Sequence, residues 1–390
     1  MPTPATDSLR DAVAATHHRY LAELAALVNL DCGSYTPDGV NQVADHVEAR
    51  LAELGAQVER LPHRSAPGEP QLGDLVIGRL VGDGPRLLLI GHMDTVFDAG
   101  TAAARPYRVE GDRATGPGVT DMKAGLLAGL HAIGALQAVG RRPSVTFVAN
   151  PDEEIGSPFS TPHIRALVPE HDAALVLECA RANGDIVSAR KGIADAEVTL
   201  IGRAAHAGIE PEKGRHAILA AARQVDRIQA LNGRWPSVTA NVGVIAGGTR
   251  PNVVPAACRY QVDLRAATSD AFDAAWSALE AIVGEPIPDG TVAELRRTAH
   301  HPPMERTPAS ARLVDLAVEI AGELGFALRD TATGGASDAN TTSAAGLPTL
   351  DGLGPVGGDD HSADEWLDLS SVVPRVTLLA TLVDRIERAL

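Results

Sequence analysis

The chain has 390 residues, more than the roughly 250 to 300 at which a single hydrophobic core stops growing, so two domains are expected. Apolar residues make up 45% and charged residues 22%, a balance typical of a folded globular protein and not of a disordered one. The formal net charge of −16 disfavours a nucleic acid or an anionic membrane as partner, and a small-molecule partner fits better.

Helices and apolar runs alternate through the first half of the chain. The N-terminal residues 1–20 carry acids and a helical apolar pattern without a continuous apolar stretch, so we expect neither a signal peptide nor a membrane span there. Apolar strands alternating with helices are typical of an α/β fold, with a mostly parallel sheet covered by helices on both faces. The predicted helices are Ser8–Leu30, Asn41–Leu54 and Lys123–Val139, and the predicted strands are Arg86–Ile90, Ser144–Ala149 and Ala173–Leu177.

A second pattern begins after Lys191. Its order is β-α-β-β-α-β, which predicts a ferredoxin-like α+β domain inserted into the first domain. The run His301-Pro302-Pro303 breaks regular structure and returns the chain to the first domain. We therefore predict one domain from 1–192 and 300–390 and an inserted domain from 193–299. The inserted elements are predicted at Ala194–Ile201, Arg215–Leu231, Val238–Ile245, Cys258–Arg265, Asp270–Val283 and Thr291–Leu295.

Three cysteines bear on the location of the protein. Cys32, Cys179 and Cys258 are odd in number and widely separated, which argues against a disulfide framework and for a reducing compartment. The expected location is cytoplasmic.

Polar side chains follow the ends of successive predicted strands. His92 and Asp94 come just after the first strand, and the pair Glu153-Glu154 follows the second. Glu178 comes directly after the third. Ligands in open α/β sheets bind at the carboxyl ends of the strands, so we expect these side chains to share one site.

Two glycine-rich loops add further polar side chains. Asp121 lies between Gly118 and a helix, where an N-capping acid would also be ordinary, and His361 lies beside acids in a late loop. Clustered carboxylates repel one another unless a cation lies among them. Two imidazoles with several carboxylates are a ligand set suited to Zn²⁺, and two metals roughly 3.5 Å apart can share a carboxylate.

These motifs together resemble the M20 metallopeptidase family, which includes glutamate carboxypeptidases, aminoacylases and succinyl-diaminopimelate desuccinylases. The resemblance covers nearly the whole chain. It rests on His92-x-Asp94, Gly118-x-x-Asp121-x-Lys123-x-Gly125, Glu153-Glu154, Glu178 and His361-Ser362.

The resemblance implies two zinc ions per subunit, with Co²⁺ or Mn²⁺ as substitutes. Asp121 would bridge the two ions, with His92 and Glu178 on one and Glu154 and His361 on the other. Asp94 would orient His92, as a metal-bound imidazole requires. Glu153 would be the general base, which takes a proton from a metal-bridging water or hydroxide and passes it to the departing amine.

The inserted domain carries further parts of the resemblance. Ala204–Gly208, Arg250–Pro255 and Asp263–Arg265 resemble the family's lid motifs, which implies a homodimer through the lid. His206 would then reach the partner's site and stabilise the oxyanion. Asn252, Arg265 and Gly335 are the candidate substrate-binding residues. Asp338 is expected to cap a helix.

The expected substrate is a small peptide or an N-acyl amino acid. Within the family, Glu rather than Asp at position 178 resembles carboxypeptidases and deacylases, and Thr333-Gly334-Gly335 resembles the glutamate carboxypeptidase branch. The two hinge positions at which that branch has basic residues are Asp185 and His301 here. Arg190 and Lys191, close to the first hinge, could compensate.

The sequence is compatible with three functions. The first is a carboxypeptidase-like zinc hydrolase, and the second is a biosynthetic or catabolic N-acyl amino acid deacylase. The third is a non-catalytic metal-binding dimer, which the presence of Glu153 disfavours because no metal requires that residue.

Overall fold

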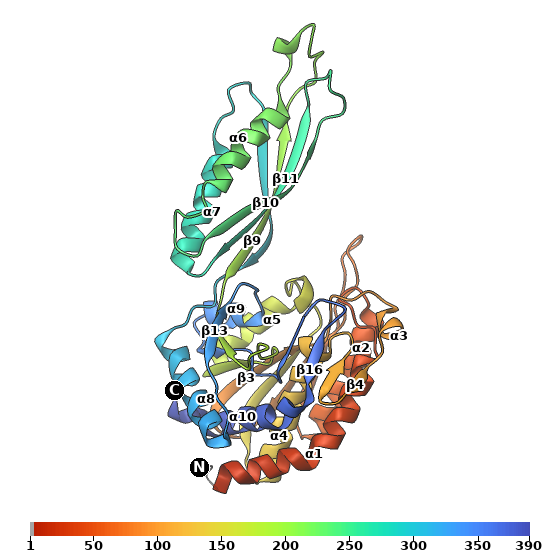
Figure 1. The fold of residues 1–390 in the computed structure, drawn as a ribbon, viewed down its shortest axis with the longest axis vertical. Coiled ribbons are helices and arrows are strands. Elements are labelled where there is room, and N and C mark those ends of the chain that lie inside the picture. The colour runs from red at the N-terminus through yellow and green to blue at the C-terminus, as the bar shows by residue number, and fades with distance from the viewer. Residues whose placement is uncertain (1–3) are drawn as a thin grey trace. The chain divides into compact units, whose positions relative to one another are not determined.

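The computed structural model describes residues 4–390 and divides into two units, shown in Figure 1. Unit 1 comprises the chain up to Ser188 together with Arg306–Ala332 and Ser337–Leu390. Unit 2 comprises Ala189–Glu305 and Thr333–Ala336. The observed unit 2 is therefore wider at both ends than the predicted 193–299, and it also includes a short segment that the sequence pattern assigns to the first domain.

A six-stranded sheet forms the centre of unit 1. Its strand order is β1-β2-β6-β3-β7-β14, in which β6, β3, β7 and β14 pair in parallel and β2 is antiparallel to both of its neighbours, β1 and β6. The three predicted strands are confirmed as β3, β6 and β7, and the predicted mostly parallel sheet is confirmed with them. The strands are β1 (Gln57–Leu61), β2 (Leu75–Leu80), β3 (Asp83–His92), β6 (Pro143–Asn150), β7 (Ala173–Val176) and β14 (Thr349–Leu350).

Helices bury both faces of this sheet. Leu87 and Leu89 of β3 belong to the main core with helices α1, α2, α4, α8 and α10, whereas Leu88 and Ile90 are buried on the opposite face. Helix α9 contacts β7 and α5. The helices are α1 (Pro4–Val28), α2 (Pro37–Glu53), α3 (Thr101–Ala104), α4 (Ala124–Ala138), α5 (Ser160–Leu167), α8 (Pro308–Leu324), α9 (Asp338–Ala344) and α10 (Val372–Arg385).

A smaller antiparallel sheet in unit 1 was not predicted. Its order is β15-β16-β5-β4, and it joins residues 357–368 to the segment before Gly116. This pairing brings the loop with His361 beside the loop with Asp121. The strands are β4 (Arg108–Glu110), β5 (Arg113–Thr115), β15 (Gly357–Gly358) and β16 (Trp366–Asp368), and a separate pair is formed by β8 (Ile186–Arg190) and β13 (Asp330–Thr333).

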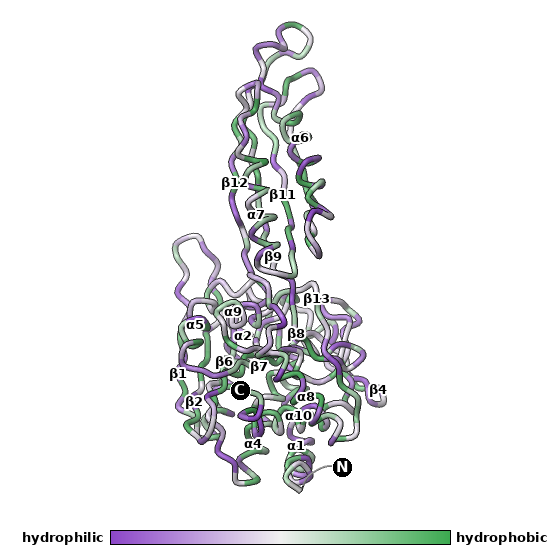
Figure 2. Tube along the Cα trace, turned by 90° about the vertical axis from the view of Figure 1, so that its left-hand side faces the viewer, coloured by the Kyte–Doolittle hydropathy of each residue, from purple (hydrophilic) through white to green (hydrophobic). Residues whose placement is uncertain are grey.

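Unit 2 has the predicted β-α-β-β-α-β order. Its antiparallel sheet runs β10-β11-β9-β12, and α6 and α7 pack on it through a separate core. Hydrophobic and hydrophilic stretches both occur in this unit in Figure 2, and buried residues alternate with more exposed ones along β9. The last strand is longer than predicted and ends at His301, just before Pro302. The elements are β9 (Gly192–Ile201), α6 (Ala217–Gln229), β10 (Thr239–Gly247), β11 (Ala257–Ala266), α7 (Ser269–Gly284) and β12 (Val292–His301).

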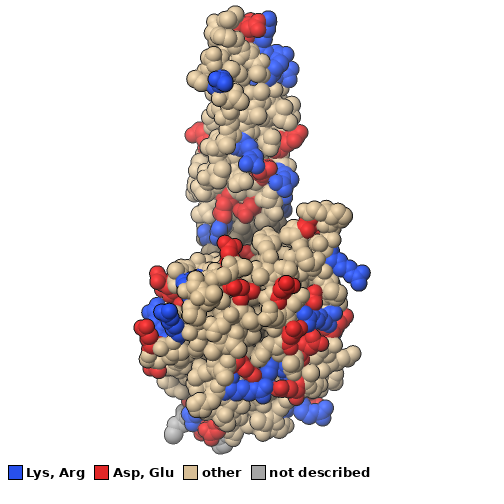
Figure 3. Space-filling view, turned by 90° about the vertical axis from the view of Figure 1, so that its right-hand side faces the viewer, with Lys and Arg blue, Asp and Glu red and all other residues tan. Residues whose placement is uncertain are grey.

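Two surface observations accompany this fold. No helix within residues 4–390 is both long enough and apolar enough to cross a membrane. On the face of unit 1 shown in Figure 3, acidic and basic side chains are interspersed.

A buried acidic side chain joins three helices of unit 1. Glu23 of α1 accepts hydrogen bonds of 2.8 Å from both His131 of α4 and Arg19, and it lies 3.2 Å from Arg50 of α2. Burial opposes ionisation of Glu23, but these partners outweigh it and lower its pKa from 4.5 to about 2. The charged form of Glu23 therefore stabilises the packing of α1, α2 and α4.

We expect the contribution of Glu23 to stability to depend on pH. Because its pKa is lower in the folded than in the unfolded chain, the stabilisation is complete above about pH 4.5 and is lost as the pH falls towards 2. Glu23→Gln should lower the free energy of unfolding by on the order of 2 kcal/mol at neutral pH, and by less below about pH 4. Urea unfolding across this range measures the difference. For the exposed control Glu110→Gln, the difference from the wild type in the free energy of unfolding should not shrink as the pH falls.

Candidate metal centre

His92 occupies the last position of β3, and its Nε2 faces two carboxylates. Its Nε2 lies 3.2 Å from Oδ1 of Asp121 and 3.6 Å from Oε1 of Glu178. Its Nδ1 lies 3.0 Å from the backbone carbonyl oxygen of Asp94 and 3.4 Å from that residue's carboxylate. A proton held on Nδ1 by Asp94 leaves the Nε2 lone pair free for a metal.

A second imidazole lies on the other oxygen of the Asp121 carboxylate. His361 Nε2 is 3.0 Å from Asp121 Oδ2 and 3.1 Å from Glu154 Oε2. Asp121 thus lies between two histidines, each of which faces one additional carboxylate. The structure brings together all five residues that the sequence predicts as ligands, with Asp121 in the middle.

Glu153 also lies within this cluster. Ligand atoms of His92, Glu153 and Glu178 all lie within 4.8 Å of one another, as do those of His92, Asp121 and Glu154. Glu153 belongs to the short 3-10 helix η2 (Glu153–Ile155) that follows β6. Its position next to the ligands suits either a base or a ligand, and the two roles predict different effects of its substitution.

The charges in this cluster favour a bound cation. Burial opposes protonation of His92, yet Asp121 and Asp94 raise its pKa well above the usual value. Hydrogen bonds with Asp121 and Glu154 raise the pKa of His361 to about 11. Burial raises the pKa of Glu153 well above its usual range, and Glu178 adds to this effect although His92 opposes it. The crowded carboxylates therefore draw positive charge onto the imidazoles, and a metal ion would supply that charge.

One buried atom gives an independent test of the fit to a metal. Among the described residues, Oε1 of Glu154 has no hydrogen-bond partner although it is buried. A buried carboxylate oxygen without a partner is costly, and coordination to a cation would satisfy it. The nitrogen and oxygen donors of this cluster fit a borderline divalent ion.

Asp94 has a wider role than the sequence suggests. Its carboxylate accepts hydrogen bonds from the backbone N–H groups of Glu153 and Glu154, both at 3.1 Å, and from the Ser34 hydroxyl at 2.7 Å. The same residue therefore orients His92 and fixes the turn that presents two acidic side chains. Ser34 was not predicted, because nothing in its local sequence marks it.

Comparison with known proteins settles the family. The sequence matches peptidase family M20/M25/M40 over residues 88–385. The chain belongs to this family. It is 33% identical over 370 residues to carboxypeptidase G2 from a Pseudomonas species, covering 92% of this chain and 87% of that protein. It is also 31% identical over 257 residues to acetylornithine deacetylase from Myxococcus xanthus, covering 63% and 66%.

A solved structure supports the M20 fold. Aminopeptidase PepT from Bacillus cereus superposes with a TM-score of 0.78 at 22% identity, covering 94% of this chain and 98% of that one. The predicted family and fold class are confirmed. The M20 chain is a metal-dependent hydrolase of peptides or N-acyl amino acids.

Glu365 is a site residue that sequence reasoning missed. Its buried carboxylate accepts hydrogen bonds from the backbone N–H groups of Gly118 at 2.8 Å, Thr120 at 2.9 Å and Asp121 at 3.1 Å. Burial raises its pKa to about 7, although these three donors favour the charged form. Glu365 therefore fixes the loop that carries Asp121.

We expect Glu365→Gln to weaken metal binding. The amide NH₂ group would face at least one backbone N–H, so the loop must shift and Asp121 with it. Losing such a supporting contact typically costs about 10- to 100-fold in metal affinity. Titration against a competing chelator measures the loss, and the exposed control Glu69→Gln should bind metal as the wild type does. Unchanged affinity in Glu365→Gln would remove this role.

Asp338 does not cap its helix as expected. The N-cap of α9 is Ser337, whose hydroxyl accepts from the backbone N–H of Ala339. The buried carboxylate of Asp338 instead accepts hydrogen bonds from Asn150 at 2.5 Å and Ser157 at 2.7 Å. It thus supports the loop after β6, which carries Glu153 and Glu154.

The remaining predicted residues lie in unit 2. His206 is exposed, and the backbone N–H of the next residue donates to the Asn252 carbonyl at 3.0 Å, so their two loops are neighbours. Arg265 donates to the Gly334 carbonyl at 2.8 Å, and Arg190 to the Gly335 carbonyl at 3.2 Å. Among the described residues, a Cβ on Gly335 would come within 4 Å of Arg190 alone, at 3.9 Å, so no contact there requires glycine.

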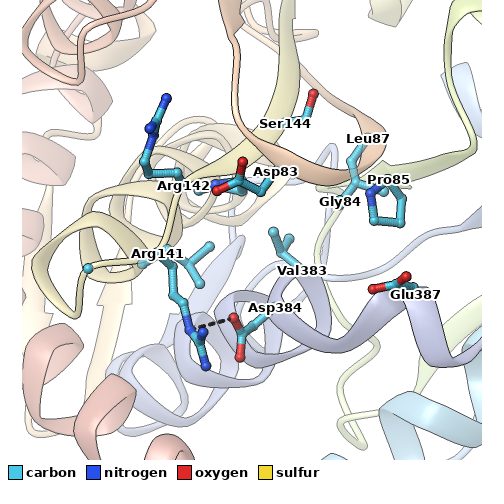
Figure 4. Close-up of a pocket in the computed structure, with 13 residues that line it drawn as sticks. Asp83, Gly84, Pro85, Leu87, Arg141, Arg142, Ser144, Val383, Asp384 and Glu387 are labelled. Carbon is cyan, nitrogen blue, oxygen red and sulfur yellow. Dashed lines mark ion pairs between the residues drawn. The ribbon is translucent and has the colours of Figure 1, made fainter.

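A cavity of about 300 Å³ lies beside the amino-terminal ends of the central strands β3 and β6 (Figure 4). Asp83 and Pro143, among its lining residues, begin β3 and β6, whereas the metal-centre residues follow the ends of those strands. Arg141 and Asp384 form an ion pair of 3.0 Å there. This cavity is separate from the candidate metal centre.

Proposed function

We propose that this M20 protein is a two-zinc, carboxypeptidase-like hydrolase that cleaves the amide bond of a small peptide or an N-acyl amino acid. The observation that carries the proposal is the position of Asp121, whose two oxygens lie 3.2 Å and 3.0 Å from two different imidazoles. One carboxylate between two separate histidine–carboxylate pairs is the arrangement that a two-metal hydrolase needs.

The residues around the metals would divide the reaction between them. Bound zinc would polarise the scissile carbonyl and lower the pKa of water. Glu153 would accept the proton of the attacking water and donate it to the departing amine. The Asp94 carboxylate would hold Glu153 in place by accepting a hydrogen bond from the backbone N–H of Glu153. The free, buried state of all three cysteines supports a reducing, cytoplasmic location.

The experiment that tests this proposal is hydrolysis of a substrate panel before and after metal removal. We expect the zinc-loaded protein to release amino acid from N-acyl amino acids or dipeptides, a chelator to abolish the release, and zinc, Co²⁺ or Mn²⁺ to restore it. No hydrolysis of any substrate by protein that holds its metals, or hydrolysis that the chelator leaves unchanged, would contradict the proposal.

We further infer that unit 2 forms a homodimer in which His206 serves the partner's site. Support comes from β10, an edge strand of its sheet, on which Val244 and Ile245 are 50% and 52% exposed. An apolar edge strand of this kind tends to pair with another chain.

Mixing two variants tests whether His206 acts on the partner. His206→Ala and Glu153→Ala should each be inactive alone. After mixing and subunit exchange, activity should return, because one site of each heterodimer then has both residues. Sedimentation measures the oligomeric state. Dimers that exchange subunits without recovering activity would exclude action on the partner, and a fully active monomer would exclude the dimer itself.

A further inference from the structure

Arg375 of α10 is a buried cation to which the proposed reaction gives no role. Only 3% of its surface is exposed. Its guanidinium donates to three backbone carbonyl oxygens, those of Gly352 at 2.6 Å, Gly354 at 3.0 Å and Gly184 at 3.1 Å. Among the described residues, no carboxylate forms an ion pair with it. Burial lowers the pKa of Arg375 to about 10, so the side chain stays charged at neutral pH.

Packing alone does not explain a charged side chain at position 375. Taking a charge out of water is costly unless the charge is paired or well hydrogen-bonded, and an apolar side chain of similar size would fill the space without that cost. What arginine adds is a planar fork of five N–H donors, which can bond several acceptors at once. The three carbonyl contacts are therefore the feature that distinguishes Arg375 from an ordinary core residue.

Segment 352–358, which Arg375 holds at two of these carbonyls, runs beside the residues that follow β7. The Gly354 N–H donates to the Glu178 carbonyl at 2.8 Å, and the Ala180 N–H donates to the Pro355 carbonyl at 3.1 Å. A Cβ on Gly354 would come within 2.9 Å of the Glu178 carbonyl oxygen, so this approach requires glycine. The segment therefore fixes the backbone that carries the Glu178 side chain.

The other end of segment 352–358 lies beside the remaining part of the metal centre. It ends in β15, which pairs with β16, and His361 follows shortly after it. A Cβ on Gly357 would come within 1.9 Å of the Thr120 hydroxyl oxygen, and Thr120 directly precedes Asp121. The segment thus contacts the backbone of Glu178 and the loop of Asp121, and it leads into the loop of His361.

We propose that Arg375 is a positioning residue for the metal centre, which holds segment 352–358 in place and thereby sets the distance between the two metal positions. This inference rests on the metal binding in the proposed function. Glu178 and His361 are the proposed ligands of different ions, and the same segment supports both. Loss of the Arg375 contacts should therefore weaken the binding of both ions, whereas loss of a side chain that supports one ligand should weaken mainly one.

Arg375→Lys tests this role, because the variant keeps the positive charge but its single ammonium cannot bond all three carbonyls. We expect its affinity for both zinc ions to fall by about 10- to 100-fold, measured on the full-length protein against a competing chelator. Arg50→Lys is the matched control: Arg50 is 7% exposed and contacts Glu23 on α1. Whatever its effect on unfolding, Arg50→Lys should bind both ions as the wild type does.

Urea unfolding of the metal-free proteins separates positioning from simple stabilisation. If Arg375→Lys lowers the free energy of unfolding but binds both ions with wild-type affinity, Arg375 is a structural residue and the proposal fails. Weakening of one metal position alone would also overturn it, because segment 352–358 would then not support both.

Gly354→Ala tests the same connection and leaves the buried charge in place. Its added methyl group would push the segment away from Glu178, so metal affinity should fall, whereas Gly322→Ala, with open space around its Cβ, should bind as the wild type does. In the double variant with Arg375→Lys, the two losses should not add, because both act through one contact. Wild-type affinity in Gly354→Ala, or fully additive losses, would overturn the proposal even if hydrolysis occurs. Wild-type protein that binds two ions but hydrolyses no substrate would contradict the proposed function alone.

Discussion

Replacement of Asp121 by Asn is expected to reduce metal binding at both positions and to lower kcat/KM by at least about 10³-fold. The carboxylate has one oxygen 3.2 Å from His92 and the other 3.0 Å from His361, and an amide keeps only one of these acceptors. The NH₂ group of the amide would take the place of one carboxylate oxygen and would face either an imidazole or a bound metal ion. Losing several kcal/mol of metal assistance corresponds to a factor of about 10³ in rate.

Metal content and activity should be measured on the same preparations of Asp121→Asn. We expect the number of bound metals to fall together with the rate. Asp112→Asn is the matched control, because Asp112 is exposed and belongs to no part of the cluster. An Asp121→Asn protein that binds two metals as tightly as the wild type would show that Asp121 does not bridge them.

Local sequence was sufficient to predict most of the residues that meet in unit 1. His92, Glu154 and Glu178 each follow a buried apolar strand, and parallel strands place their carboxyl ends along one edge of a sheet. Asp121 precedes a helix in a glycine-rich loop at the same edge. These positions follow from periodicity and chain order, which a single sequence displays directly.

Glu365 and Ser34 could not be predicted in this way. Glu365 reaches the loop of Asp121 only because β16 pairs with β5, a contact between segments roughly 250 residues apart. The Ser34 hydroxyl donates a hydrogen bond to Asp94, which lies 60 residues further along the chain. Such contacts depend on tertiary pairing that leaves no periodic signal in either segment.

Unit 2 shows a different limit of sequence reasoning. Its six elements were predicted in order, but β12 extends to His301 and was predicted to be half as long. Its last residues include Arg296 and Arg297, whose charges hide the apolar alternation that marks a strand. Thr333–Ala336 groups with unit 2 through contacts such as that of Arg265 with Gly334, which no local pattern reveals.

The neighbouring residues Glu153 and Glu154 provide the sharpest test of mechanism. Glu154 lies 3.1 Å from His361 and has one buried oxygen without a partner among the described residues, as expected of a metal ligand. Glu153 has no such contact with His361, and burial raises its pKa well above the usual range. We propose that the first is a ligand and the second a proton carrier.

Glu153→Gln is therefore expected to lower kcat by about 10²- to 10⁴-fold while metal content and KM stay near their wild-type values, because only proton transfer is lost. Glu154→Gln, one residue away and equal in size and charge change, should instead lose metal and recover partly when excess zinc is added. Elemental analysis and steady-state kinetics on both variants distinguish these outcomes. If Glu153→Gln also loses metal, and excess zinc restores its rate, then Glu153 is a ligand and the proton must be carried by another group.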